Sequence, residues 1–196
     1  MIFNDISGIE SLGAELRLPR VSQIGITVPD LAGGVRYYGK LFSVGRWYRS
    51  KIVGAEYFYR DRPIDLSLDI AVGYSGGMQI ELIRHRSEVE HIYTRYAPQG
   101  GFGLHHLGAV VSDLDRKVGM LRDMGIMPLQ TGTIRFGRAG VTRFAYLDTV
   151  ERAGFIYELI ETRAFGVNMG MPEWVVKLGC VTGDAEIITG NGRWII

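Results

Sequence analysis

The stretch Gly103-Leu104-His105-His106-Leu107-Gly108-Ala109-Val110-Val111-Ser112-Asp113-Leu114 places a histidine in an apolar run that ends at an Asp-Leu pair. An earlier stretch, Val21-Ser22-Gln23-Ile24-Gly25-Ile26-Thr27-Val28-Pro29-Asp30-Leu31, repeats this pattern. When the two are overlaid, Gln23 falls on His106, Gly25 on Gly108 and Asp30 on Asp113. Alternating apolar residues followed by a helix-capping aspartate are typical of a strand that leads into a helix.

A second pair of stretches repeats in the same order. Gln79-Ile80-Glu81-Leu82-Ile83 matches Ile156-Tyr157-Glu158-Leu159-Ile160. The chain therefore contains two copies of one repeated unit. Two copies indicate a domain with pseudo-twofold symmetry, because a solenoid needs at least three repeats.

Length and composition limit the classes of protein that fit. A chain of 196 residues suits one domain or two small modules that share a core. The formal net charge of +1 argues against nucleic acid as a partner, since such a surface needs a clustered basic excess. No stretch approaches the roughly 18 apolar residues of a membrane span. Because Cys180 is the only cysteine, no internal disulfide forms, and a cytoplasmic location is expected.

The order of the elements predicts a βαβββ pattern twice. In the first unit, a strand at 23–28 and a helix at 31–41 precede strands at 52–60, 65–72 and 78–84. In the second unit, a strand at 104–111 and a helix at 114–124 precede strands at 127–135, 141–148 and 154–162. The predicted organisation is a lead-in at 1–20, a first module at 21–85, a linker at 86–101, a second module at 102–163 and a C-terminal extension at 164–196. The extension should hold a helix that starts near Pro172 and a hairpin around Gly190-Asn191-Gly192.

The repeated carboxylates suggest a metal site. Glu81 and Glu158 lie within apolar strands, where a carboxylate either faces solvent or is buried and paired with a charge or a metal. If the two units pack around a pseudo-twofold axis, Gln23, Glu81, His106 and Glu158 converge in one cleft. One imidazole, one amide oxygen and two carboxylates suit one divalent ion such as Zn, Mn, Co, Ni or Mg. The alternative is that both glutamates face solvent on half-buried strands.

Residues beside these four carry separate expectations. Because strand side chains alternate, His105 should face away from His106, as a packed or hydrogen-bonded residue, and Glu161 should lie in solvent opposite Glu158. A set of five aromatic residues either lines a cavity for an apolar substrate or belongs to the core and a dimer interface. The set is Trp47, Tyr48, Tyr57, Phe58 and Tyr59.

The four motifs, in this order and spacing, resemble the vicinal oxygen chelate superfamily, which includes glyoxalase I, methylmalonyl-CoA epimerase, extradiol dioxygenases and bleomycin-resistance proteins. The resemblance covers residues 21–163. It implies an α+β fold in which two βαβββ modules form a cupped mixed sheet around a metal, with the C-terminal helix and hairpin outside the repeat. Carried over by position, the metal ligands are Gln23, Glu81, His106 and Glu158.

The resemblance also implies a chemistry. The expected function is that of a metal-dependent isomerase, epimerase or lyase, which transfers a proton next to a metal-bound carbonyl through an enediolate, with Glu158 or Glu81 as the base. Epimerases of the family use a separate glutamate, for which Glu56 is a poor candidate. One alternative is an extradiol dioxygenase, which needs two histidines and one carboxylate for its iron; here Gln23 stands where the second histidine would be. The other is a non-catalytic binding protein of the resistance type. A homodimer and a small-molecule substrate, apolar or a thioester, are expected as partners.

Overall fold

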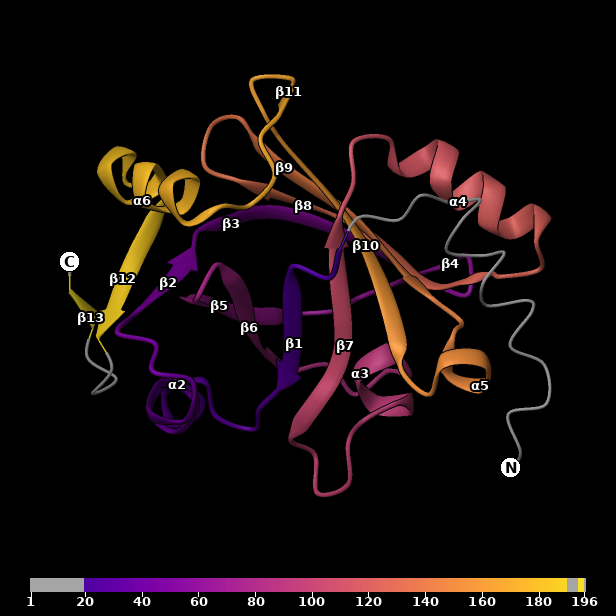
Figure 1. Ribbon diagram of the computed structural model, residues 1–196, viewed down its shortest axis with the longest axis horizontal. Helices are drawn as coiled ribbons and strands as arrows, with labels where there is room; N and C mark the ends of the chain where they lie inside the picture. The colour runs from indigo at the N-terminus through magenta and orange to yellow at the C-terminus, as the bar shows by residue number, and fades with distance from the viewer. Residues whose placement is uncertain (1–19, 190–193, 196) are drawn as a thin grey trace.

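The computed structural model describes residues 20–189 and 194–195, and it confirms the predicted α+β class (Figure 1). One mixed sheet curls into a cup. Its strands follow the order β13 (Trp194–Ile195), β12 (Ala185–Thr189), β2 (Arg46–Ser50), β5 (Leu68–Ser75), β6 (Met78–His85), β1 (Gln23–Thr27), β7 (Gly103–Val110), β10 (Ile156–Ala164), β9 (Gly140–Leu147), β8 (Pro128–Phe136), β3 (Ile52–Tyr59) and β4 (Arg62–Ile64), while β11 (Val167–Asn168) pairs with β10.

The centre of the sheet has the symmetry that the repeat implies. β1 runs antiparallel to β7, with β6 parallel to β1 on one side and β10 parallel to β7 on the other. Across the central pair, Gln23 faces Gly108 and Gly25 faces His106. Each repeat therefore sets its own polar residue opposite the glycine of the other repeat, as a twofold axis between β1 and β7 requires.

One strand crosses from the first repeat to the second. Only Lys51 separates β2 from β3, yet β2 pairs with β5 and β12 while β3 pairs with β8 and β4. The chain thus passes at Lys51 from the strands of the first repeat to those of the second, and β3 arches across the middle of Figure 1. The sequence does not predict β2. Its neighbouring residues Trp47 and Tyr48 are both buried, each in a different hydrophobic cluster, so the strand lacks the usual alternation of apolar and polar side chains. The stretch at 52–59, expected in the sheet of the first module, pairs instead with β8.

Two helices cover the outside of the cup. α2 (Leu31–Leu41) packs against β5 and β6, and its first turn is capped by Asp30, whose carboxylate accepts from the Gly33 N–H at 2.6 Å. α4 (Leu114–Asp123) packs against β9 and β10 and has Asp113 as its N-cap. Both helices start at the predicted residues. None of the helices in the described part of the chain has the length and apolar character needed to cross a membrane.

The remaining helices are short or lie in the C-terminal extension. α3 (Ile92–Arg95) and α5 (Val150–Ala153) are single turns in connections. α6 (Glu173–Thr182) begins directly after Pro172, as predicted, and Tyr48 Oη donates to Glu173 Oε1 at 2.8 Å. β12 and β13 pair antiparallel as the expected hairpin, whose turn lies outside the described residues.

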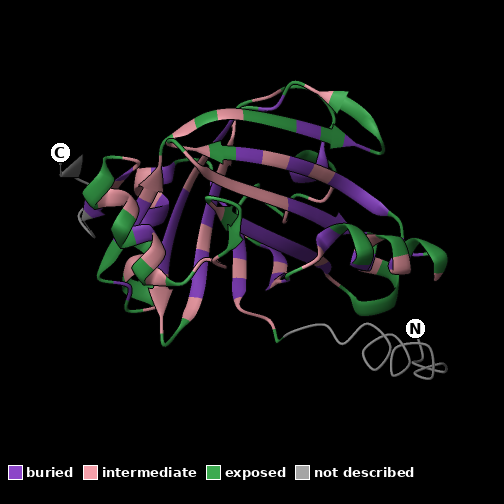
Figure 2. Ribbon diagram, turned by 90° about the horizontal axis from the view of Figure 1, so that it is seen from above, coloured by how far each residue is buried: buried purple, intermediate pink, exposed green. Residues whose placement is uncertain are grey.

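Side chains of the central strands alternate between the helices and the inside of the cup. Ile80 and Leu82 of β6 are buried against α2, so Gln79 and Glu81 point inward. On β10, Leu159 packs toward α4 while Glu158 points inward. Figure 2 shows buried purple bands along these strands. The alternation thus carries both glutamates into the interior rather than into solvent.

A cluster of arginines around Asp69 stabilises the rim of the cup. Arg49 Nη2 lies 2.7 Å from Asp69 Oδ1, Arg84 Nη1 lies 3.7 Å from Oδ2, and Arg86 also pairs with Oδ2. Burial alone would raise the pKa of Asp69, but hydrogen bonds from Arg86 and Arg49 lower it below its ordinary value of 3.8. A depressed folded-state pKa means that this stabilisation is present above the ordinary pKa and is lost as the pH falls through the folded-state value.

We therefore expect Asp69→Asn to lower the free energy of unfolding by about 1–2 kcal/mol near neutral pH. The difference from the unmodified protein should shrink as the pH is lowered from about 4. Urea unfolding followed by circular dichroism at several pH values measures both effects. Asp148→Asn, at an exposed aspartate, is the control and should change little. A difference that stays constant down to low pH would contradict the assigned role of Asp69.

Candidate metal centre

The four polar residues that the sequence singles out meet inside the cup. They come from four adjacent strands, β6, β1, β7 and β10. His106 Nε2 lies 3.0 Å from Glu158 Oε2, 3.5 Å from Glu81 Oε2 and 3.3 Å from Gln23 Oε1. His106 and Glu158 are buried, whereas Glu81 is partly open to the cavity. One nitrogen and three oxygens therefore surround one small volume.

Two glycines make room for this cluster. A Cβ atom on Gly25 would lie 1.8 Å from His106 Cε1, and one on Gly108 would lie 2.5 Å from Gln23 Oε1. The His106 ring thus lies directly over the backbone of Gly25, and the Gln23 amide over that of Gly108. These contacts explain why a glycine follows the polar residue by two positions in both repeats.

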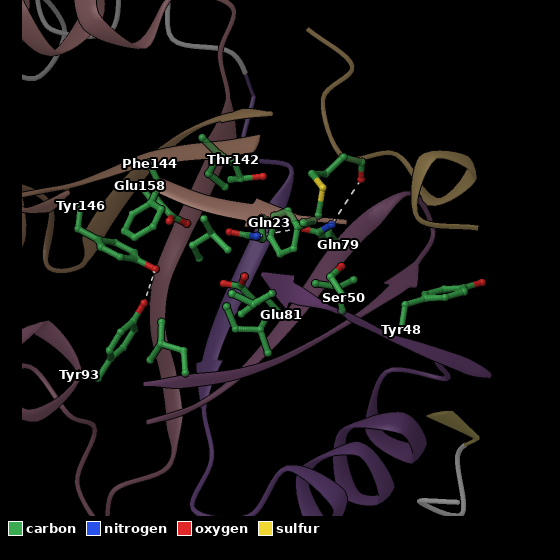
Figure 3. A pocket seen from close by; sticks show the side chains of 18 residues that line it. Gln23, Tyr48, Ser50, Gln79, Glu81, Tyr93, Thr142, Phe144, Tyr146 and Glu158 are labelled. Carbon is green, nitrogen blue, oxygen red and sulfur yellow. Dashed lines mark hydrogen bonds between the residues drawn. The ribbon is translucent and has the colours of Figure 1, made fainter. Parts of the chain in front are cut away.

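A chain of amides fixes the orientation of Gln23. The Met171 carbonyl can only accept, so the Nε2 end of Gln79 faces it, at 3.4 Å, and also donates to Tyr74 Oη at 2.8 Å. Gln79 Oε1 is then the acceptor for Gln23 Nε2, at 2.7 Å. This leaves Gln23 Oε1 pointing at the cluster (Figure 3). Gln79 was not predicted as a site residue, although its place two residues before Glu81 puts both side chains on one face of β6.

A chain of imidazoles fixes the orientation of His106 in the same way. His105 Nε2 lies 3.4 Å from the Ile92 carbonyl, which can only accept, so this nitrogen carries the proton. His105 Nδ1 then accepts from His106 Nδ1, 3.0 Å away. The proton-free nitrogen of a neutral His106 is therefore Nε2, which faces the carboxylates. Hydrogen-bonded outer partners of this kind commonly orient metal-binding histidines.

The position of His105 differs from the expectation. The pairing of β1 with β7 shifts register between Gly25 and Ile26, which face His106 and Leu104. The shift corresponds to an extra residue on β7 at His105, as in a β-bulge. The two consecutive rings therefore lie together, with centroids 5.3 Å apart, rather than on opposite faces of the strand. Burial and the neighbouring His106 lower the pKa of His105 to about 3, so it is neutral.

The cluster holds excess negative charge in a buried place. Burial alone would lower the pKa of His106, but the Glu158 and Glu81 carboxylates raise it to about 9. Burial raises the pKa of Glu158, and His106 opposes this shift. With both carboxylates ionised, the site keeps a net negative charge even when the ring is protonated. A bound cation is a common means of stabilising such a buried charge.

The distances match those of ligands around one divalent ion. Two ligand atoms that each lie ~2.1 Å from an ion, at about 90–109° to each other, are about 3.0–3.4 Å apart. The contacts of His106 Nε2 span 3.0–3.5 Å, and the ligand atoms of Glu81, His106 and Glu158 all lie within 4.8 Å of one another. Apart from His106 Nε2, 3.0 Å away, Glu158 Oε2 has no hydrogen-bond partner among the described residues. The residues therefore fit a divalent cation.

A small cavity opens beside the cluster, with a volume of about 50 Å³. Gln23, Glu81 and Glu158 line it, together with aromatic and aliphatic walls (Figure 3). The hydroxyls of Tyr93 and Tyr146 bind each other at 2.8 Å on one side. Of the five aromatics expected near a substrate, Tyr48 lines this cavity. Trp47 packs against α2 in the outer core, and Phe58 is 39% exposed on the surface.

Two other glutamates lie outside the cluster. Glu161 was expected in solvent, but it is buried, and its carboxylate lies 3.1 Å from Arg163 and 3.8 Å from Arg143. The neighbouring arginines, which no alternation pattern reveals, account for this burial. Glu56 is exposed on β3 and pairs with Arg135 at 3.1 Å, so it does not line the cavity.

The chain is similar to a known protein family and to several solved structures. A family model described as the Glyoxalase/Bleomycin resistance protein/Dioxygenase superfamily matches residues 22–146. Methylmalonyl-CoA epimerase from Mycobacterium tuberculosis is 22% identical, with 73% of this chain and 87% of that chain covered and a TM-score of 0.49. A hypothetical protein from Bacillus halodurans C-125 is 21% identical, with 76% and 98% covered and a TM-score of 0.49. A mutant of 4-hydroxymandelate synthase from Streptomyces coelicolor is 14% identical, with 79% and 51% covered and a TM-score of 0.48. No curated protein matches the chain.

Proposed function

The chain belongs to the glyoxalase/bleomycin resistance protein/dioxygenase superfamily, and from this membership we propose that it is a metal-dependent isomerase, epimerase or lyase. The proposal rests on one observation above all. Gln23 is oriented through Gln79 by the Met171 carbonyl, and His106 is oriented through His105 by the Ile92 carbonyl. As a result, one lone pair of Gln23 and one of His106 face the same point beside two carboxylates. When bound, a divalent ion would polarise a substrate carbonyl and stabilise negative charge on its oxygen.

The chain's own residues then have separate roles. Gln23, His106 and Glu158 hold the ion, and Glu81 also lies within its reach. We assign to Glu81 the removal of a proton from the carbon next to the carbonyl and its return to the substrate. Its side chain is 14% exposed against 5% for Glu158, and it lies farther from His106, at 3.5 Å against 3.0 Å. Glu81 is thus the carboxylate that is less tightly held and more open to the cavity.

The ring-cleaving dioxygenase is the less favoured reading. Its iron is held by two histidines and one carboxylate. Among the residues that the structure describes, His106 is the one imidazole that faces the carboxylates, since both nitrogens of His105 have other partners. The first-strand position, where a second histidine would be needed, holds Gln23.

The metal is tested without knowing the substrate. After removal of metals with EDTA, the protein should bind one equivalent of Mn, Co, Ni, Zn or Mg. An ion at about 100 times its dissociation constant adds about 2.7 kcal/mol to stability. For a chain of this size the unfolding temperature should then rise by about 5–10 °C. Calorimetry and elemental analysis check both results. The absence of binding by all five ions would refute the metal site.

Proton transfer is tested with heavy water. A panel of 2-oxoaldehyde hemithioacetals and 2-substituted acyl thioesters is incubated with metal-loaded protein in D₂O. Deuterium should enter the carbon next to the carbonyl, and EDTA should stop this exchange. Oxygen consumption with catechols would instead support the dioxygenase. Tight binding of panel members without exchange would indicate a non-catalytic binding protein.

A further inference from the structure

An apolar groove lies between α6 and the turns at the ends of β8–β9 and β10–β11. Its volume is about 700 Å³, which is in the range of small-molecule sites. Trp174 and Leu178 of α6 form one wall and are each 55% exposed, while Phe165 and Val167 on the opposite wall are 86% and 60% exposed. Figure 2 shows the exposed and half-buried bands of α6 at the left of the view. A contiguous apolar surface of this kind usually marks a binding site.

The groove adjoins the cavity at the metal centre. Ser50, Phe136 and Met171 line both spaces. Met171 is also tied to the centre itself, because its carbonyl accepts from Tyr74 Oη at 2.8 Å and faces Gln79 Nε2. The segment between β11 and α6 is therefore held against the residue that orients Gln23. The inner end of the groove therefore lies at the wall of the cavity that holds Gln23, Glu81 and Glu158.

The size of the inner cavity requires such an extension. A volume of about 50 Å³ holds a few water molecules or a carbonyl-bearing fragment, but not a whole small-molecule substrate. Most of the substrate must therefore lie outside the inner cavity.

A second outer cleft also borders the inner cavity, and its chemistry is different. Apolar side chains such as Leu66 and Leu68 form part of its lining, but it also carries four charged residues, Arg49, Lys51, Asp69 and Glu186. These charges are already paired, because Arg49 lies 2.7 Å from Asp69 and Lys51 lies 3.9 Å from Glu186. This cleft suits water and polar groups, whereas the groove along α6 suits hydrocarbon.

We propose that the groove binds the apolar part of the substrate, an alkyl chain or a fused ring system, while the carbonyl at its end reaches Gln23, Glu81 and Glu158. This inference rests on the proposed function and adds the substrate class. It gives the C-terminal extension a role in specificity, since α6 supplies one wall of the groove and lies outside the two repeats.

The test uses the full chain and straight-chain fatty acids from butanoate to dodecanoate as probes. Binding is followed by calorimetry on the metal-free protein and by the visible spectrum of the cobalt-loaded protein. Affinity should rise about three- to fourfold per methylene, as expected for hydrocarbon transfer from water. The longer acids should also change the cobalt spectrum, because the head group reaches the metal.

Leu178→Asp should lower the affinity for dodecanoate at least tenfold, because it places a charge in the groove wall. Val181→Asp is the matched control, since Val181 is 84% exposed on the same helix and does not line the groove. The affinity of Val181→Asp for dodecanoate should stay unchanged. Because both replaced residues are exposed, both variants should keep the unfolding temperature of the unmodified protein.

The outcomes separate this inference from the proposed function. If cobalt binds but chain length has no effect on affinity, the groove assignment is wrong and the metal site stands. If cobalt does not bind but affinity still rises with chain length, the proposed function fails while the groove is retained. Light scattering covers the remaining case. A dimer that Leu178→Asp converts to monomers, without a change in dodecanoate affinity, would show that the groove is a subunit interface and overturn the inference.

Discussion

Glu81→Gln is expected to abolish proton exchange while one divalent ion stays bound, whereas Glu158→Gln should lose the ion itself. A positioned base contributes about 10²–10⁴ to rate, so exchange in Glu81→Gln should fall by at least 100-fold. In Glu158→Gln, the side chain that lies 3.0 Å from His106 Nε2 loses its negative charge and keeps only one oxygen. Its metal affinity should fall by more than the roughly 10–100-fold that outer partners typically cause.

Glu161→Gln is the matched control for both variants. It neutralises a buried carboxylate on the same strand as Glu158, but on the side of the arginines Arg143 and Arg163. It should lower stability and leave metal content and exchange per bound metal unchanged. Metal content by elemental analysis, Mn²⁺ affinity by calorimetric titration and deuterium uptake are measured on all three variants. If Glu158→Gln carries the exchange defect and Glu81→Gln loses the metal, the two roles must be interchanged.

Gly25→Ala is expected to disrupt the metal centre although it removes no ligand. The new methyl group would lie 1.8 Å from His106 Cε1, so the ring or the strand must move. Overpacking of this kind typically costs about 1–3 kcal/mol of stability. Metal affinity should fall at least tenfold, because Nε2 no longer points at the carboxylates.

Gly108→Ala should have a smaller effect. Its methyl group would meet the end of the Gln23 amide at 2.5 Å, a less severe overlap than the 1.8 Å between a Gly25 methyl group and the His106 ring. Gly54→Ala on β3 is the control, since a Cβ there meets nothing within 4 Å. Thermal unfolding with and without Mn²⁺ ranks the three variants. Equal losses in Gly25→Ala and Gly54→Ala would show that the effect is general strand destabilisation.

Features that depend on the repeat could be predicted from the sequence. The overlay of Gln23 on His106 and of Glu81 on Glu158 anticipated which side chains meet, because pseudo-twofold pairing follows from matching strands. The helices at 31 and 114 were found because an aspartate cap and an apolar face are local signals.

Features that depend on contacts between distant residues could not be predicted. The shift at His105 arises from the pairing of β7 with β1, and no residue type marks it. Gln79 gains its role from Met171, far along the chain, whose carbonyl sets the direction of both amides. Glu161 is buried because Arg143 and Arg163 neutralise it. The crossing at Lys51 likewise depends on where β8 lies.

That crossing has a consequence for how the chain is made. During synthesis β3 leaves the ribosome well before its partner β8, so an emerging first repeat carries a strand with an unpaired edge. Exposed strand edges promote association with other chains. Pairing between segments so distant in sequence is also slow to form. The two repeats, although copies of one unit, therefore cannot complete their folding one after the other, and β3 stays open to association with other chains until β8 is made.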